Sequence, residues 1–306
     1  MTTSAGQVVL RAAVGHHAYL APLRDGTVTS ERFTLALEPF EGSLLQLMRR
    51  MIRAGEFDVC EMSPSSYLLA REAGAPLMGL PVFPYRLFPF DQIVLRDDSP
   101  LSGPADLAGA RIGVRTRAQP TSLWLRHIFS AAYGVDFGRA RWTFVAEDPV
   151  ATVRRPAGSA ERVGESLYDL LAQGVIDVAM GVSDVPAGYR SLFADPVAEA
   201  RRWYSRSALI PANHLVVVRS DVAGRVDLAE IAKLFDAAKS RYVDHGGIHD
   251  ADIERLRAIT GLADPMPNGW SANERMWTTL IDAMVAQGLL AHRPRVSGTI
   301  ERMEVT

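Results

Sequence analysis

Four titratable side chains stand next to expected strands, where they could carry protons to and from a ligand: His16, His17, Glu61 and His214. Histidine titrates near neutral pH, so it can both donate and accept a proton. Glu61 could take up a phenolic proton or orient a histidine ring. We expect these four residues to be catalytic. The alternative for His214, which begins a strand, is a hydrogen bond to a neighbouring strand and nothing more.

The same four side chains are also a conceivable set of metal ligands, because imidazole and carboxylate groups bind transition metals. The chain has no His-x-His or His-Glu-x-x-His spacing, which are the usual local signs of such a site. We therefore expect no cofactor and keep a divalent metal as the alternative.

Two strand-to-helix turns have the residue types of an anion site. In the first, Ser63 stands at the N-cap and Pro64 at the first helical position of a helix that ends near Gly74. In the second, the polar stretch 115–119 precedes Pro120. The backbone N–H groups at such a helix start can bind an anion. The plainer alternative is an ordinary turn with a good cap.

Polar and charged side chains on or near these turns are the expected contacts of an acidic ligand. Arginine suits a carboxylate because its planar fork matches two oxygens. Facing turns would suit a ligand with two acidic groups, or with one acidic group and a polar ring. A surface ion pair for Arg86 and a helix-capping role for Glu61 are the alternatives. The expected substrate-binding residues are Ser63, Ser65, Ser66, Arg86, Arg115, Thr116, Thr121 and Asp184.

Strands and helices alternate along most of the chain, which is typical of α/β proteins with mostly parallel sheets. Apolar runs predict strands at 8–14, 33–40, 57–60, 76–83, 92–96, 111–114, 142–146, 175–180 and 213–219. Helical spacing of apolar residues predicts helices at 43–54, from 64 to near 74, and at 120–133, 163–172, 196–204, 228–244, 250–260 and 271–287.

The order of these elements predicts two lobes joined by two hinge crossovers. Lobe 1 comprises 1–96 and 213–306, and lobe 2 comprises 97–212. Such lobes close on a ligand in the cleft between them, and ligands of these sheets lie beyond the carboxyl ends of the strands.

Length and charge narrow the class of protein. A chain of 306 residues is long for one compact core and suits two lobes. The net charge of −2 favours neither nucleic acid nor an anionic membrane as a partner. The single cysteine, Cys60, cannot form an internal disulfide and is expected to pack in a strand. The first residues lack a basic stretch followed by an apolar run, so we expect a cytoplasmic protein.

Five segments, in the same order along nearly the whole chain, resemble the 4,5-dihydroxyphthalate decarboxylase family. They are FDVCEMSPSSYL, LPVFPYRLF, DLAGARIGV, LIPANHLVVVR and PNGWSANER. The resemblance implies the fold of type II periplasmic binding proteins, non-oxidative loss of carbon dioxide from a hydroxylated aromatic acid, and a possible homo-oligomer. By motif it implies functional roles for Glu61, Ser63, Ser65, Arg86, Arg115 and His214.

The chain departs from the family pattern in two places. The segment 181–186, GVSDVP, replaces an expected Ala-Arg-Pro-Pro, so an arginine is missing and Asp184 has the opposite charge. The stretch 147–162 also fits the pattern poorly. The resemblance therefore does not assign dihydroxyphthalate as the substrate of this chain.

The leading hypothesis is a non-oxidative decarboxylase of a hydroxylated, phthalate-like carboxylic acid, with proton transfer to the ring carbon. The alternative is a cytoplasmic small-acid binding protein or sensor without catalysis. A weaker third hypothesis is a biosynthetic enzyme that acts on another small acid. Each of the three takes a small acidic ligand.

Overall fold

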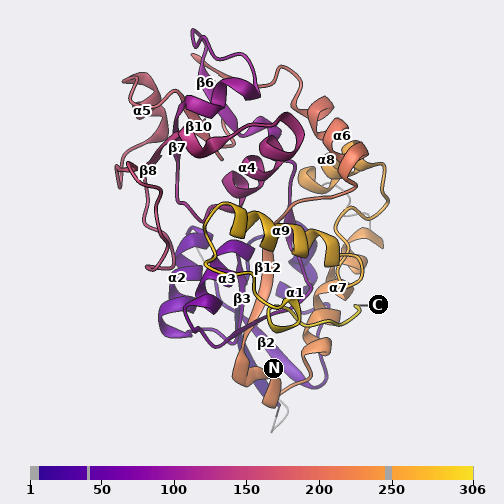
Figure 1. Ribbon diagram of the computed structural model, residues 1–306. Helices are drawn as coiled ribbons and strands as arrows, with labels where there is room; N and C mark the ends of the chain where they lie inside the picture. Colours follow the sequence, from indigo (N-terminus) through magenta and orange to yellow (C-terminus); the bar gives the residue numbers. More distant parts are fainter. Residues whose placement is uncertain (1–6, 40–41, 245–249, 306) are drawn as a thin grey trace. The chain divides into compact units, whose positions relative to one another are not determined.

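The computed structural model describes residues 7–39, 42–244 and 250–305 and divides into two compact units (Figure 1). Unit 1 comprises Met1–Arg86, Ala212–Thr279 and His292–Thr306, and unit 2 comprises Leu87–Pro211 and Leu280–Ala291. In the part of the chain that the structure describes, no helix has the length and apolar character needed to cross a bilayer.

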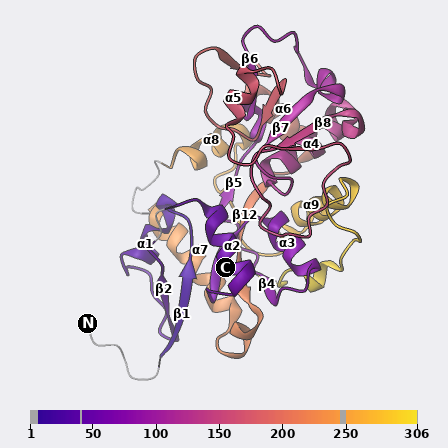
Figure 2. The same ribbon diagram turned by 90° about the vertical axis from the view of Figure 1, so that its left-hand side faces the viewer.

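Unit 1 contains a mixed sheet with the strand order β2-β1-β3-β12-β4, and β5 pairs with β12. The parallel neighbours β2 and β1 are seen side by side in Figure 2. β12 runs antiparallel to β3, β4 and β5, so the sheet is less parallel than the sequence predicts. The strands are β1 (Val8–Ala13), β2 (Phe33–Leu37), β3 (Val59–Met62), β4 (Leu77–Gly79), β5 (Tyr85–Arg86) and β12 (Ala212–Arg219).

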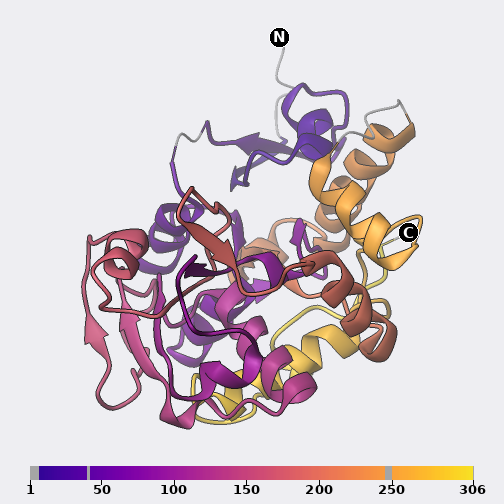
Figure 3. The same ribbon diagram turned by 90° about the horizontal axis from the view of Figure 1, so that it is seen from above.

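Among the helices of unit 1, α2 has clear local start and stop signals. The N–H of Ser43 donates to Oε1 of Gln46 at the start of α2, and Gly55 ends that helix with a φ of 57°. Helix α7 contacts the short α1, and both are seen in Figure 3, in orange and indigo. The helices are α1 (Ala21–Arg24), α2 (Leu44–Ala54), α3 (Pro64–Glu72), α7 (Leu228–Asp244) and α8 (Ala251–Thr260). Helix α9 (Glu274–Ala286) contributes its first residues to unit 1 and its later ones to unit 2.

Unit 2 contains a second sheet with the strand order β11-β6-β10-β7-β8-β9. β7 is parallel to β8 and β10, whereas β6 is antiparallel to both of its neighbours. The strands are β6 (Ile93–Arg96), β7 (Arg111–Val114), β8 (Arg141–Phe144), β9 (Ala160–Glu161), β10 (Val178–Met180) and β11 (Tyr189–Ser191). The helices are α4 (Pro120–Tyr133), α5 (Leu167–Ala172) and α6 (Pro196–Ser207).

Short 3₁₀ helices complete the set of regular elements in the described part of the chain. They are η1 (Ala18–Leu20), η2 (Pro89–Asp91), η3 (Pro104–Gly109), η4 (Phe137–Arg139), η5 (Ser220–Gly224) and η6 (Val296–Gly298).

Most predicted elements are present, and the differences have local causes. The expected strand 76–83 ends at Gly79, and the expected loop 84–89 contains β5, which pairs with β12. The expected helix 163–172 begins only at Leu167, where Ser166 caps it, and Val163 is 56% exposed. The expected strand 33–40 ends at Leu37, and its last residue lies outside the described part of the chain.

The unit boundaries also differ from the predicted lobes. The first falls between Arg86 and Leu87 rather than after 96, because the strand β6 pairs with β10 and β11 of unit 2. The second falls between Pro211 and Ala212, beside the predicted position. The segment Leu280–Ala291, predicted in lobe 1, belongs to unit 2, where the Gln287 amide donates to the carbonyl of Leu123 (3.0 Å).

One turn of unit 2 depends on a glycine. Gly181 follows β10 with a φ of 82°, and its carbonyl accepts a hydrogen bond from Nε2 of Gln119 (2.8 Å). A Cβ at this position would lie 2.4 Å from that Nε2 atom. The turn therefore needs both the left-handed backbone and the close approach that glycine allows.

We predict that Gly181→Ala lowers the free energy of unfolding by about 1 kcal/mol more than Gly134→Ala does. Gly134 is the matched control, because its φ is also positive (67°) and nothing lies within 4 Å of its added Cβ. Urea denaturation of the two variants measures the difference. Equal losses would show that the Gln119 contact contributes nothing.

Candidate functional site

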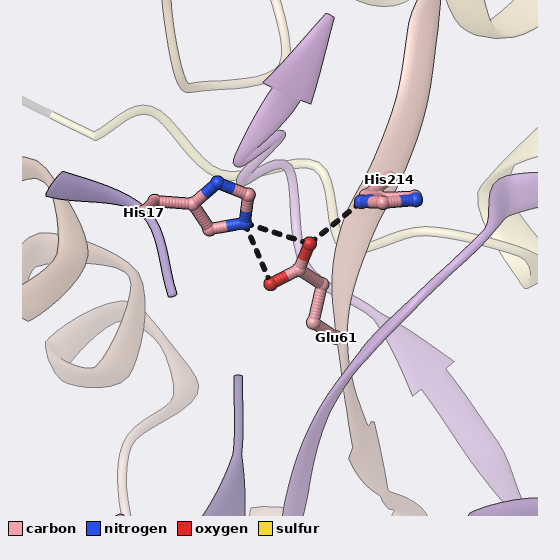
Figure 4. A group of neighbouring side chains, drawn as sticks. All are labelled: His17, Glu61 and His214. Atoms are coloured by element: carbon pink, nitrogen blue, oxygen red, sulfur yellow. Dashed lines mark hydrogen bonds and ion pairs between the residues drawn. The ribbon is translucent and has the colours of Figure 1, made fainter. Parts of the chain in front are cut away.

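His17, Glu61 and His214 form a hydrogen-bonded cluster in unit 1 (Figure 4). Nε2 of His17 lies 2.9 Å and 3.0 Å from the two carboxylate oxygens of Glu61. Nδ1 of His214 lies 2.7 Å from Oε1 of Glu61. The Glu61 side chain is fully buried, whereas the imidazoles are 16% and 20% exposed. The cluster therefore places two partly accessible proton carriers on one buried anion.

Three neighbouring strands position the cluster. Glu61 lies on the middle strand β3, between β1 and β12. His17 follows β1 after a short turn, and His214 lies on β12 two residues from Val216, the residue paired with Glu61. Because side chains alternate along a strand, His214 lies on the same face of the sheet as Glu61.

A glycine makes room for the Glu61 carboxylate. The N–H of Gly15 donates to Oε2 of Glu61 (2.8 Å). A Cβ on Gly15 would lie 3.0 Å from Nε2 of His17 and 3.1 Å from Oε2 of Glu61. The guanidinium of Arg24 donates to the carbonyl of Gly15 and so holds the other side of that residue. The turn after β1 thus supplies Glu61 with a backbone donor as well as an imidazole.

Aromatic rings border the two histidines. The ring centroid of Tyr85 lies 5.2 Å from that of His214 and 6.2 Å from that of His17. Tyr19 stacks on His17 at 5.6 Å, and its hydroxyl donates to the carbonyl of Pro84. These contacts restrict the orientations of both imidazoles.

The negative charge of Glu61 and the positive charge of a protonated imidazole stabilise each other. Burial by itself would raise the pKa of Glu61, but the charges and hydrogen bonds of His17 and His214 outweigh it and hold that pKa well below its ordinary value. Burial by itself would lower the pKa of His17, but the Glu61 carboxylate raises it above 6.5. The folded protein thus favours an ionised Glu61 and a protonated His17.

The hydrogen bonds to Glu61 also decide which ring nitrogens remain for a ligand. His17 uses Nε2 and His214 uses Nδ1 toward the carboxylate. Figure 4 shows the second nitrogen of each ring directed away from Glu61. When a carboxylate accepts a hydrogen bond from one ring nitrogen, it determines which nitrogen of the imidazole carries the proton. His214 could therefore present Nε2, and His17 could present Nδ1, to a reacting group.

The cluster is also the set of described residues best suited to hold a metal ion, since one atom from each side chain lies within 4.8 Å of the others. The separations from Oε1 to the two imidazoles, 2.7 Å and 2.9 Å, are hydrogen-bond distances. Two ligand atoms about 2.1 Å from one tetrahedral ion stand roughly 3.4 Å apart. The side chains would have to separate before an ion could enter.

The first predicted anion turn uses its donors internally. The hydroxyl of Ser63 accepts from the N–H of Ser66 (3.2 Å), and its carbonyl accepts from the N–H of Tyr67 (3.0 Å). Ser63 also donates its hydroxyl proton to Oγ of Ser66 (2.7 Å), and Ser65 lies fully buried beside it. The Ser63 cap and the first helical turn therefore use the N–H groups of 66 and 67, which the predicted anion site would need.

Arg86 is buried rather than exposed at the surface, where the alternative interpretation placed it. It is 2% exposed, its guanidinium donates to Oδ1 of Asn273 and to the carbonyl of Pro267 (3.2 Å), and it lies over the ring of Phe83 (4.9 Å). Burial lowers the pKa of Arg86 to about 10. These contacts join the LPVFPYRLF and PNGWSANER segments within unit 1. A role in substrate binding stays a prediction.

The remaining candidates are not members of the cluster. His16 is exposed and is not one of the three clustered side chains. Arg115, Thr116, Thr121 and Asp184 belong to unit 2, where Arg115 and Asp184 are exposed and the two threonines are buried. Their part in binding a ligand, and the predicted cleft between the lobes, stay predictions.

The second predicted anion turn does bind a carboxylate, but one of the protein's own. Asp148, which is 8% exposed, accepts from the N–H of Ala118 (2.8 Å) and from the N–H of Arg117 (3.4 Å). The amides of this turn are therefore used by a carboxylate from a stretch without regular pattern, and a ligand anion at this turn stays a prediction.

Three residues of the site are absent from the predicted set: Gly15, Tyr85 and Asn273. Gly15 precedes the histidine pair, and Tyr85 and Asn273 lie inside two of the family-like segments. A systematic look at those segments could have found the last two. The close approach at Gly15 had no sequence signal, because it depends on the pairing of β1 with β3.

Comparison with curated proteins places the chain among relatives of known name. It is 32% identical over 232 residues to a 4,5-dihydroxyphthalate decarboxylase of Comamonas testosteroni, covering 70% of this chain and 69% of the relative. The chain belongs to the 4,5-dihydroxyphthalate decarboxylase family. A protein of the same name from Pseudomonas putida is 29% identical over 217 residues, covering 64% of this chain and 81% of that protein. No family model matches the chain.

Solved structures show the same fold at low sequence identity. The periplasmic aliphatic sulphonate binding protein SsuA from Escherichia coli matches with a TM-score of 0.58 and 14% identity over 97% of this chain and 93% of that one. The desulfurization enzyme DSZB matches with a TM-score of 0.54 and 15% identity over 97% of each chain. The predicted periplasmic-binding-protein-like fold is confirmed.

We predict that Glu61→Gln destabilises the protein most between pH 4.5 and 6.5 and less at higher pH. The raised pKa of His17 means that its contribution is complete below 6.5 and is lost as pH rises through the folded-state value. The lowered pKa of Glu61 means that its contribution is present above 4.5 and is lost as pH falls through the folded-state value.

Urea denaturation at several pH values, with the exposed Glu31→Gln as control, measures this dependence. The control should show a small difference from the wild type at every pH. A destabilisation by Glu61→Gln that stays constant from pH 5.5 to pH 8.5 would contradict the assigned ion pair.

Proposed function

We propose that the chain is a carboxy-lyase that removes carbon dioxide, without oxidation, from a hydroxylated phthalate-type aromatic acid. The observation that carries this proposal is the cluster of His17, Glu61 and His214 in a member of the 4,5-dihydroxyphthalate decarboxylase family. A protein that only binds an acid needs donors for its carboxylates. It has little need for two imidazoles held on a buried carboxylate.

The reaction needs a proton delivered to carbon. A ring activated by a hydroxyl group accepts a proton at the carbon that bears the carboxylate, and positive charge spreads to the phenolic oxygen. The bond between that carbon and the carboxylate then breaks, its electron pair restores the aromatic ring, and carbon dioxide leaves. The added proton stays on the ring, so no oxidant or reductant is consumed.

His214 is the proposed proton donor, through Nε2. Its Nδ1 is directed to Glu61 (2.7 Å), and this hydrogen bond to the buried carboxylate fixes the orientation of the ring. His17 shares the same carboxylate and is proposed to contact the phenolic oxygen. After carbon dioxide leaves, His214 regains a proton from water.

Binding of the substrate carboxylates is proposed for Arg115, Thr116 and Thr121, because arginine and hydroxyl donors suit carboxylate oxygens. The proposed substrate class comes from the relatives, whose name specifies 4,5-dihydroxyphthalate. Asp184 stands where the family pattern has an arginine. The substituents on the substrate ring are therefore to be identified with a panel of acids. Cytoplasmic location and a homo-oligomer stay predictions.

We predict that His214→Ala lowers kcat for carbon dioxide release about 10²- to 10⁴-fold, the range for loss of a general acid. The substrate panel comprises ortho- and para-hydroxylated aromatic mono- and dicarboxylates, including 4,5-dihydroxyphthalate. The matched control is His292→Ala, which removes an exposed histidine and should leave kcat unchanged.

Either of two outcomes would contradict the proposal. Release of carbon dioxide at the wild-type rate by His214→Ala would exclude the assigned donor. Thermal stabilisation of the wild type by one of these acids, with no carbon dioxide release from any of them, would indicate a binding protein instead.

We also propose that the reaction proceeds without a metal ion, because the carboxylate of Glu61 bonds both imidazoles directly. Activity is therefore expected to survive dialysis against a chelator, with less than a twofold change in kcat. Metal content measured on the dialysed protein is the control. Loss of activity with recovery on addition of one divalent metal would contradict the metal-free mechanism.

A further inference from the structure

Unit 2 contains a cavity of about 600 Å³ that four arginines line. It lies among the end of α9, the residues of α4, the start of β8 and the loop that follows β8. The lining includes Arg117, Arg126, Arg154, Arg155, Phe137 and Trp142. No residue of the decarboxylation cluster contributes to it.

Arg117 is buried at this cavity with unused donors. It is 6% exposed, and its Nη2 donates to the carbonyls of Gln287 (2.8 Å) and Gly288 (3.2 Å). Its Nε and Nη1 have no hydrogen-bond partner among the described residues. A buried guanidinium with two unsatisfied donors costs free energy unless a ligand or water supplies acceptors.

Arg126 stands beside Arg117 and adds a second buried charge. It is 7% exposed, donates to the carbonyls of Ser122 (3.2 Å) and Arg117 (3.2 Å), and lies over the ring of Trp142 (5.2 Å). Burial, and then the charge of Arg117, lower the pKa of Arg126 to about 9. An anion bound between the two arginines would offset the repulsion between their positive charges.

The remaining charges at the cavity are partly compensated. Arg155 lies 3.5 Å from Asp148 and 3.1 Å from Glu161, yet its Nη1 has no partner in the described part of the chain. Asp136, the acidic residue of the lining, accepts from the N–H of Gly138 (2.8 Å). Arg154 is exposed at the rim. Arg117 and Arg126 therefore keep most of the uncompensated positive charge.

We propose that this cavity is a binding site for a small multivalent oxyanion, such as a phosphate or an organic dicarboxylate. Guanidinium groups bind phosphate and carboxylate oxygens through charge-assisted hydrogen bonds, and Nε and Nη1 of Arg117 are two unused donors for them. The aromatic rings of Phe137 and Trp142 add apolar surface for an organic anion.

Some of the arginines that line the cavity come from a stretch of sequence that is particular to this chain. Arg154 and Arg155 come from the stretch 147–162, which departs from the family pattern. Arg117 lies in the turn that also carries Arg115 and Thr116, two of the proposed substrate contacts. An anion at Arg117 would thus hold a turn that the proposed function uses, although binding to the cavity does not depend on that function.

Isothermal titration of the full chain with inorganic phosphate, and separately with phthalate, at constant ionic strength in chloride tests the site. We expect saturable binding of at least one of them. Binding that Arg154→Glu weakens would assign the cavity, to a phosphate ligand if only phosphate binds there and to a carboxylate ligand if phthalate does. Phthalate binding that Arg154→Glu leaves unchanged would instead report the proposed active site and would count against the cavity. Arg117→Met should weaken binding about tenfold or more, as expected for loss of charge-assisted hydrogen bonds.

Arg154→Glu, at an exposed position, should weaken binding several-fold without risk to folding. Arg139→Glu is the matched control, because Arg139 is exposed and adjacent in sequence to lining residues but does not line the cavity. This control should bind as the wild type does. No saturable binding of either anion, or equal effects of Arg154→Glu and Arg139→Glu, would overturn the proposal.

Discussion

The structure of unit 1 depends on how it keeps a fully buried carboxylate ionised. Glu61 sits on the middle strand of the sheet, where an unpaired charge would be costly. Two imidazoles and one backbone N–H offset that cost at distances of 2.7–3.0 Å. The strands on either side, β1 and β12, are thereby tied to β3 through side chains as well as through the sheet. The same arrangement leaves one nitrogen of each imidazole directed away from the carboxylate.

This compensation explains how a binding-protein fold can support chemistry. Solved structures with the same fold include a sulphonate-binding protein and a desulfurization enzyme, so the fold alone does not decide between binding and catalysis. Turn amides and arginines suffice to hold an acid. An imidazole paired with a buried carboxylate can in addition give up a proton to carbon and recover it.

The arginines of unit 2 have two kinds of environment. Arg111 has its own partner, because its guanidinium pairs with Asp177 at 2.5 Å. The guanidinium groups of Arg117 and Arg126 instead donate to backbone carbonyls, and Arg126 lies over the ring of Trp142. Two donors of Arg117 have no partner among the described residues. The same physical rule, that buried charge requires a partner, accounts for the cluster in unit 1 and motivates the anion site in unit 2.

The sequence by itself determined the α/β class, most helix and strand positions, and the family. The strand β7 and the helix α4 have the predicted bounds, because periodic apolar residues, Pro120 and Gly134 act locally. It also identified His17, Glu61 and His214 as candidates. Only the tertiary structure decided that these three meet while His16 does not, since register and strand order bring distant residues together. It likewise decided that Arg86 is buried, because its partner Asn273 lies 187 residues away in sequence and so gives no local signal.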